Sequence, residues 1–124
     1  MAAIDYLELE DLLEIGRAII SDFRVKDIGL LESALARPRT TIFGKDAYVT
    51  FEEKVASLLH SLARNHSLVD GNKRLAWSAT RIFCLMNGYD IDYTADSAEA
   101  LVIGATIGKY DVAQIVPMLK ISKI

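Results

Sequence analysis

The sequence is poor in the residues that mark disulfide-rich, disordered or fibrous proteins. Its 124 residues include one cysteine, two prolines and seven glycines. A single cysteine cannot form an internal disulfide, so a reducing, cytoplasmic location is the natural expectation. Hydrophobic residues make up 52% and charged residues 25%, which excludes a disordered or collagen-like chain. The length predicts one domain over residues 1–124.

A basic charge excess and long apolar runs are also missing. The net charge is −3, from 14 basic and 17 acidic residues, so no basic field indicates direct nucleic-acid binding. The first twelve residues carry four acidic side chains and no basic one, unlike a signal peptide. Uncharged stretches such as 101–108 are far shorter than the roughly 20 apolar residues that span a membrane. We expect neither a membrane nor a nucleic acid as partner.

Helical periodicity dominates the sequence that is present. Apolar residues recur at three- and four-residue steps, which predicts helices at about 7–22, 28–36, 51–65, 73–87, 95–107 and 110–120. Thr50 and Glu53 have the spacing of a capping box at the start of the third helix. The predicted inward faces of the third and fourth helices are Val55, Leu58, Leu59 and Leu62, and Leu75, Ala76, Ala79, Ile82, Phe83 and Met86.

One stretch, residues 39–50, lacks helical rhythm. β-Branched and aromatic residues lie on both sides of Gly44, which predicts a small hairpin or flap. The predicted fold class is therefore all-α, a single domain of about six helices with a short β flap.

The residues with chemical potential gather between the third and fourth predicted helices. Residues 65–74 read Asn-His-Ser-Leu-Val-Asp-Gly-Asn-Lys-Arg. Main-chain N–H groups in the first turn of a helix lack intrahelical partners and attract phosphate. Gly71, Asn72 and Lys73 therefore form a candidate anion cradle.

Side chains of this segment supply the other groups that phosphoryl or nucleotidyl transfer needs. His66 is a candidate base for an attacking hydroxyl, because histidines titrate near neutral pH. Asp70 is a candidate Mg²⁺ ligand, since this ion takes one or two carboxylates plus phosphate oxygens and waters. Lys73 and Arg74 are candidate phosphate partners.

Each of these residues also has a structural interpretation. A lone histidine at a helix end is more often a polar cap than a base, and Asp-Gly-Asn is an ordinary turn. Lys73 and Arg74 could equally be solvated surface charges. Their occurrence within nine residues favours a functional site, but the residue chemistry alone leaves both interpretations open.

The segment resembles the signature loop of the Fic superfamily, His-x-Phe-x-Asp/Glu-Gly/Ala-Asn-x-x-x-Arg. Lysine after the asparagine, here Lys73, is similar to the Doc (death-on-curing) toxins of that superfamily. Residues 29–38 and 53–65 also look like Doc-type sequence. The resemblance covers most of the chain and implies a Fic fold.

The resemblance implies a role for each matching position. His66 becomes the general base and Asp70 the Mg²⁺ ligand, while the cradle of Gly71, Asn72 and Lys73 binds the phosphates. Arg74 either binds phosphate or braces the loop. Arg64 either contacts the nucleotide or makes a structural pairing.

The resemblance also implies an activity and partners. Fic proteins usually transfer AMP from ATP to a target hydroxyl, whereas Doc toxins are kinases that transfer the γ-phosphate of ATP to a threonine of elongation factor Tu and block translation. Doc toxins have a Phd-type antitoxin, whose C-terminal helix lies in a groove of the toxin. We expect a Doc-like kinase; the alternatives are a Fic-type AMP transferase and a catalytically silent antitoxin-binding module.

The chain departs from the pattern at several positions. Ser67 and Leu68 replace the usual Pro and Phe, and we expect Leu68 to anchor the loop less firmly by about 1 kcal/mol of burial. Ser78 replaces an asparagine of some Doc proteins, and Arg81 lies one turn later than an arginine of Fic adenylyltransferases. Ser67 and Leu68 are the support for a silent module.

Other residues have weaker functional interpretations. The flap either aligns a target segment by strand addition or is a plain connection, and its Phe43 and Tyr48 either contact a substrate or close the core. His60 is predicted to be structural and partly buried. Trp77, Phe83 and Cys84 are predicted to lie in the core, the last without a nucleophilic role. The apolar residues of the first helix suit burial better than partner binding.

Overall fold

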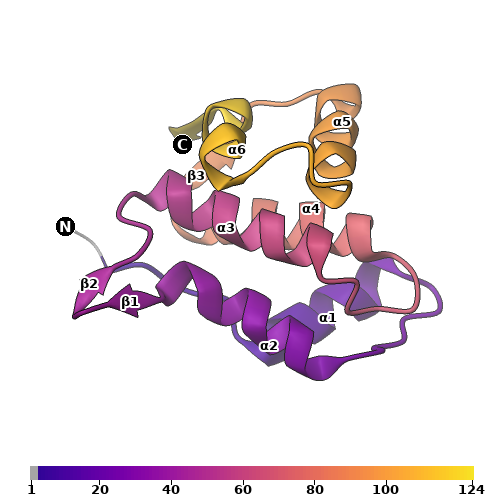
Figure 1. Ribbon diagram of the computed structural model, residues 1–124. Helices are drawn as coiled ribbons and strands as arrows, with labels where there is room; N and C mark the ends of the chain where they lie inside the picture. The colour runs from indigo at the N-terminus through magenta and orange to yellow at the C-terminus, as the bar shows by residue number, and fades with distance from the viewer. Residues whose placement is uncertain (1–2) are drawn as a thin grey trace.

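The computed structural model describes residues 3–124, which form a mainly helical domain (Figure 1). The α-helices are α1 (Leu9–Ile19), α2 (Ile28–Ala36), α3 (Phe51–Arg64), α4 (Asn72–Met86), α5 (Ala95–Thr106) and α6 (Val112–Leu119). The short elements are a 3₁₀ turn η1 (Arg37–Arg39) and the strands β1 (Thr41–Ile42), β2 (Lys45–Asp46), β3 (Tyr89–Ile91) and β4 (Ile121–Lys123). This architecture confirms the predicted all-α class with a short β flap.

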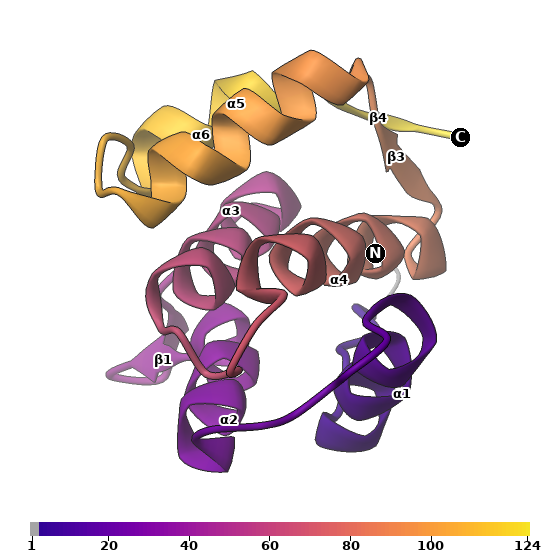
Figure 2. The same ribbon diagram turned by 90° about the vertical axis from the view of Figure 1, so that its right-hand side faces the viewer.

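The helices form three layers (Figures 1 and 2). α3 and α4 make the middle layer, with α1 and α2 on one side and α5 and α6 on the other. α3 contacts α2, α4, α5 and α6, so it is the centre of the core. Its predicted inward residues, Val55, Leu58, Leu59 and Leu62, are all buried. At its start, Thr50 and Glu53 form the predicted capping box.

The buried face of α4 is shifted from the predicted one. Leu75, Ala76, Ala79 and Phe83 are buried as predicted, but Ile82 and Met86 are 37% and 39% exposed. Thr80 and Cys84 are buried as well, so the buried arc of the helix circumference is centred near Phe83. The prediction for Ile82 and Met86 was wrong because these two side chains lie at the margin of that arc.

α1 is shorter than its predicted range of 7–22. It begins at Leu9, and Ile20 already has an extended backbone, with φ −118° and ψ 116°. The following chain turns back, so that the Phe23 ring lies against Gly16, where a Cβ atom would be 2.3 Å from Phe23 Cε1. Leu12 of α1 is fully buried and Ile20, the next residue after the helix, is buried, which agrees with burial as the role of this segment.

A second small sheet joins the end of the chain to the segment after α4. β3 pairs antiparallel with β4, with Ile91 opposite Ile121. Because Lys120 has a left-handed backbone with φ 48°, α6 stops at Leu119 and the chain enters β4. Three-residue strands carry too little alternation to be predicted, and this sheet was missed. Among residues 3–124, no helix is long and apolar enough to cross a membrane.

Candidate active site

The α3–α4 loop, residues 65–71, is anchored to the chain that follows α1. Main-chain N–H groups of Lys26 and Asp27 donate to the carbonyl of Ser67 at 2.8 and 3.0 Å, and Val25 forms a β-bridge with Leu68. Both Ser67 and Leu68 are 1% exposed. Leu68 is therefore fully buried, and main-chain hydrogen bonds add to its anchoring.

The Asn72 side chain closes the loop. Its Oδ1 accepts from the Leu68 N–H at 2.9 Å, and its Nδ2 donates to the Leu68 carbonyl at 3.0 Å. The carboxamide therefore holds the loop, and the predicted anion cradle involves the main chain of Asn72 and not this side chain. The main-chain N–H of Asn72 keeps its place in the first turn of α4, where the first intrahelical hydrogen bond runs from Leu75 to Gly71.

Gly71 makes the turn into α4. Its φ of 89° lies in the left-handed region, which glycine adopts without strain. A Cβ atom at this position would lie 2.5 Å from Cδ1 of Ile20, so the residue that directly follows α1 packs on the turn. Glycine is therefore needed here for backbone conformation and for close packing.

His66 is the first residue after the C-cap of α3 and projects from the loop into solvent. Asn65 donates from Nδ2 to the Leu30 carbonyl at 3.2 Å, which ties the end of α3 to α2. His66 itself has a left-handed backbone with φ 49° and an exposed side chain. Such backbone strain in a non-glycine residue occurs often at functional sites. Within residues 3–124 the imidazole forms no hydrogen bond.

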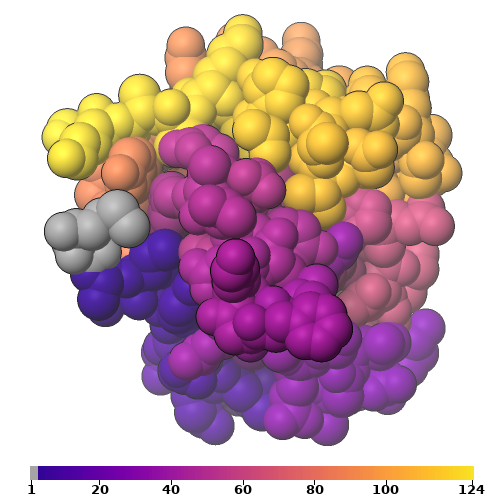
Figure 3. Space-filling model, turned by 60° about the vertical axis from the view of Figure 1, so that its left-hand side comes forward, coloured from indigo at the N-terminus to yellow at the C-terminus, as the bar shows by residue number. Residues whose placement is uncertain are grey.

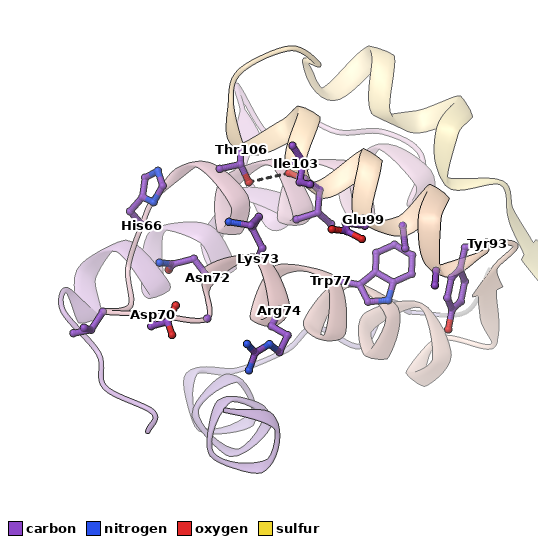
Figure 4. Close-up of a pocket in the computed structure, with 15 residues that line it drawn as sticks. His66, Asp70, Asn72, Lys73, Arg74, Trp77, Tyr93, Glu99, Ile103 and Thr106 are labelled. Carbon is purple, nitrogen blue, oxygen red and sulfur yellow. Dashed lines mark hydrogen bonds between the residues drawn. The ribbon is translucent and has the colours of Figure 1, made fainter. Parts of the chain in front are cut away.

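The polar side chains of the loop and of the first turn of α4 point to two sides (Figure 4). His66 and Lys73 lie on the side that faces α5, near Thr106 and Ile103, whereas Asp70 and Arg74 lie on the opposite side. Asp70, Lys73 and Arg74 are all exposed, and none of them takes part in an ion pair within the described chain. The loop and the first turn of α4 therefore offer one carboxylate and two cations that no charged neighbour among residues 3–124 neutralises.

A cavity of about 650 Å³ extends from this loop along the groove between α4 and α5. The loop side contributes His66, Asp70, Gly71, Asn72, Lys73 and Arg74. The far wall includes Trp77, Tyr93, Ala98, Glu99, Val102 and Ile103. A volume in this range is typical of a small-molecule site.

Sequence reasoning missed the far wall of the cavity. Trp77 was assigned to the core, but it is half-buried and lines the cavity, while Phe83 is a core residue as predicted. Lys73 and Trp77 are four residues apart and share a face of α4. That spacing was the available signal; no local pattern indicated that Glu99 of α5 would face them.

Arg64 lies outside the cavity lining. Its Nη1 donates to the carbonyl of Thr106 at 3.1 Å, which joins the end of α3 to the end of α5. Thr106 in turn lines the cavity. Of the two interpretations of Arg64, the structure shows the structural pairing.

Asp70 fits the role of a single protein ligand for Mg²⁺. Its carboxylate is exposed at the cavity and makes no hydrogen bond within residues 3–124. The same residues contain no group of three or more His, Cys, Asp or Glu side chains that could hold a metal alone. Mg²⁺ at phosphate-transfer sites commonly takes one or two carboxylates and completes its shell with substrate oxygens and waters.

Two titratable residues lie away from the cavity. His60 is half-buried, with Nδ1 2.8 Å from Nη1 of Arg37, and burial, followed by the charges of Arg37 and Arg64, lowers the pKa of His60. Cys84 is fully buried, and burial raises the pKa of its thiol to about 12. Both agree with the predicted structural roles.

The hairpin is at the other end of α3 from His66. β1 and β2 pair with Thr41 opposite Asp46, around a tip of Phe43 and Gly44 that both have positive φ. Figures 1 and 3 show the hairpin at the start of α3, exposed on the face away from the loop. The fourteen residues of α3, about 21 Å along the helix axis, lie between the hairpin end of α3 and the end that carries His66.

The two aromatic residues of the hairpin differ in their contacts. Phe43 is 102% exposed and closes no part of the core. Tyr48 is half-buried, and its hydroxyl accepts from Nε of Arg37 at 2.8 Å.

Two comparisons with known proteins agree with this geometry. The sequence profile of the Fic/DOC family matches residues 6–84, which run from the segment before α1 to Cys84 in α4 and include the whole loop. A protein named Toxin Doc from Mycolicibacterium smegmatis is 48% identical over 101 residues, which cover 79% of this chain and 78% of that protein.

Proposed function

The chain belongs to the Fic/DOC family, and on this premise we propose that it is the toxin of a toxin–antitoxin system. The proposed activity is that of a protein kinase, which transfers the γ-phosphate of ATP to a threonine of elongation factor Tu and so stops translation in the cytoplasm. The observation that carries the proposal is the position of Lys73 at the start of α4. It directly follows Asn72, projects into the α4–α5 groove beside open main-chain N–H groups, and has no ion-pair partner in the described chain.

The loop residues have distinct tasks in this reaction. His66 accepts the proton of the threonine hydroxyl, whose oxygen forms the new bond to the γ-phosphorus while the bond from that phosphorus to the β–γ bridging oxygen breaks and ADP leaves. The N–H groups at the start of α4 and the Lys73 ammonium bind the phosphate oxygens. Asp70 would hold Mg²⁺, which supplies charge neutralisation at the phosphates. Gly71, Asn72 and Leu68 keep the loop in shape.

Lys73 is the residue on which the choice between the two transfer reactions rests. A glycine at this position leaves room beside the helix N-terminus, whereas the lysine fills that room and attracts phosphate oxygens. We propose that the lysine thereby determines which phosphate faces the acceptor. Arg74, on the other side of the loop, either binds a phosphate or braces the loop.

Labelled ATP tests the proposed reaction. The protein is incubated with elongation factor Tu, Mg²⁺ and ATP that carries one label in the α-phosphate and another in the γ-phosphate. Transfer of the γ-label alone is expected, and Lys73→Gly is expected to reduce it. Transfer of the α-label would mean AMP transfer instead, and unchanged γ-transfer by Lys73→Gly would contradict the role of the lysine.

Expression without an antitoxin tests whether the chain is an active toxin. We expect the intact chain to stop growth, His66→Ala to permit it, and co-expression of a Phd-type antitoxin to restore it. Equal growth with the intact chain and with His66→Ala would favour a silent antitoxin-binding module. The buried Leu68 and the main-chain hydrogen bonds of the loop support the active alternative, because the loop is well held despite the loss of Pro and Phe.

A further inference from the structure

A half-buried arginine links the hairpin to α3. Arg37, the first residue of η1, donates from Nε to the Tyr48 hydroxyl at 2.8 Å, and its guanidinium carbon lies 5.5 Å from the centre of the Tyr48 ring. Nη1 of the same guanidinium lies 2.8 Å from Nδ1 of His60 and donates to Oγ of Ser61 at 3.0 Å. His60 and Ser61 both belong to α3. Arg37 therefore joins the segment after β2 to the C-terminal half of α3.

The contact with Arg37 fixes the protonation state of His60. A guanidinium has donors and no acceptor, so Nδ1 of His60 accepts a hydrogen bond from Nη1 of Arg37. The imidazole is therefore neutral and carries its proton on Nε2. A proton added at Nδ1 turns this acceptor into a donor and places a second positive charge against the guanidinium. The contact with Arg37 cannot survive that change.

The other charged groups around His60 do not compensate a proton there. Burial, followed by the positive charges of Arg37 and Arg64, lowers the pKa of His60, and Asp111 is the acidic group that opposes this effect. Asp111 caps α6, since its Oδ1 accepts from the Gln114 N–H at 2.9 Å, and Arg64 is held by the end of α5. Within residues 3–124, Arg37 forms no ion pair with a carboxylate. Protonation of His60 is therefore relieved by displacement of Arg37.

The hairpin has a second anchor that does not involve His60. The buried Nζ of Lys54 contacts the Tyr48 carbonyl and lies 3.2 Å from Oδ2 of Asp46. The hairpin itself is closed by the N–H of Ala47, which donates to the Thr40 carbonyl at 2.9 Å. Loss of the Arg37 contact therefore loosens the hairpin without detaching it from α3.

We propose that His60 and Arg37 form a proton-operated latch on the hairpin. While His60 is neutral, Arg37 is held between α3 and the Tyr48 hydroxyl, and the hairpin is fixed. When Nδ1 of His60 takes up a proton from solvent, Arg37 leaves it, the hydrogen bond to Tyr48 is lost, and residues 40–48 become mobile around the Lys54 contact. The inference is independent of the proposed function, because the latch requires neither nucleotide nor catalysis.

An NMR titration of the full chain, from pH 7.5 downwards, tests the latch. The ring signals of His60 report its protonation, and exchange of the Ala47 N–H with water, corrected for the pH dependence of exchange in an unstructured chain, reports closure of the hairpin. The protection of this N–H is expected to fall about tenfold in step with the His60 signals, which corresponds to the loss of one hydrogen bond to a charged group. The Ile124 N–H, which donates to the Gly88 carbonyl beside the other small sheet, is expected to change by less than about twofold.

Three variants assign the response to the latch. His60→Gln keeps an acceptor for Arg37 without titrating, and is expected to hold Ala47 protected throughout the pH range. Tyr48→Phe removes the hydroxyl that Arg37 binds, so His60 is expected to titrate without changing the protection of Ala47. His66→Gln is the matched control, because it removes the other histidine of the chain, and it is expected to keep the full response.

Three results would overturn the latch. Constant protection of Ala47 while His60 takes up its proton would show that the hairpin does not depend on His60. Equal losses at Ala47 and Ile124 would mean that protonation unfolds the whole domain. A response that persists in His60→Gln would place its cause at another group, and Tyr48→Phe supplies the same decision if His60→Gln does not fold.

Discussion

At the scale of single residues, the loop depends on backbone conformations that few side chains tolerate. His66 and Gly71 both have positive φ, 49° and 89°, at the two ends of the short segment between α3 and α4. The left-handed conformation at His66 costs roughly 1–2 kcal/mol, which the surrounding hydrogen bonds of Ser67 and Leu68 offset. His66 is thereby held exposed beside the cavity.

Gly71 provides the first prediction, because two effects coincide there. Gly71→Ala is expected to lower the free energy of unfolding by about 2–3 kcal/mol, from backbone strain and from the clash with Ile20. Gly88→Ala is the matched control, since Gly88 has a similar φ of 81° but no atom of residues 3–124 within 4 Å of its Cβ position. The control is expected to lose only about 1 kcal/mol in urea unfolding. Equal losses for the two variants would contradict the close approach of Ile20 to the turn.

His60 provides a prediction on the pH dependence of stability. Because the pKa of His60 is lowered in the folded protein, the unfolded chain binds a proton more readily as the pH falls below the ordinary value of 6.5. The contribution of the neutral His60 to the free energy of unfolding is therefore complete above pH 6.5. It decreases as the pH falls from 6.5 through the lowered pKa of the folded protein. His60→Gln keeps an acceptor for Arg37 without titrating, and is expected to flatten this decrease in denaturant titrations between pH 7.5 and 5. The same slope in both proteins would exclude His60 as its source.

At the scale of elements, the end of a helix could be predicted where contacts between residues near that end determine it. Thr50 and Glu53 cap α3 through contacts three residues apart, so the start of α3 was found from sequence. β3 and β4 depend on pairing between Ile91 and Ile121, and no local pattern contains that contact. The early end of α1 has a similar cause, because it depends on Phe23 folding back on Gly16.

A buried lysine of α3 holds the hairpin through an ion pair, and the next prediction concerns that pair. The Lys54 side chain is 3% exposed at the start of α3, and its Nζ contacts the Tyr48 carbonyl and lies 3.2 Å from Oδ2 of Asp46 in β2. Asp46→Asn leaves this ammonium without its counter-charge and is expected to cost about 1 kcal/mol in the free energy of unfolding. Lys45→Gln, at the neighbouring exposed position that has no ion pair with the described residues, is expected to stay within about 0.5 kcal/mol of the intact protein. A loss no larger than that of Lys45→Gln would show that the pair contributes nothing to holding the hairpin.

At the scale of the whole molecule, the candidate site is made where the layers meet. The loop is held by the chain after α1, and the far wall of the cavity comes from α5 in another layer. The loop side of the cavity could be predicted because His66, Asp70 and Lys73 are close in sequence. The position of Glu99 in the cavity lining could not, because only the packing of α5 against the middle layer places it there.

Cys84 reports on the integrity of these layers. It is the single cysteine of the chain and is fully buried in α4, with a thiol pKa of about 12. Its reaction with a thiol reagent at neutral pH is expected to be at least about a thousandfold slower in the folded protein than in denaturant, because the reaction requires a large opening of the core. Reaction at comparable rates would mean that α4 is not packed between its neighbours as described.

The central claim is that the α3–α4 loop transfers a group from a bound nucleotide with His66 as the base. Its most direct test is a parallel measurement, on intact protein and His66→Ala, of nucleotide affinity and of the rate at which labelled phosphate from ATP becomes bound to elongation factor Tu. We predict that His66→Ala keeps its affinity within about twofold and transfers roughly 10²–10⁴ times more slowly, since the imidazole acts on the acceptor hydroxyl and not on the nucleotide. Transfer by His66→Ala at the rate of the intact protein would contradict the claim.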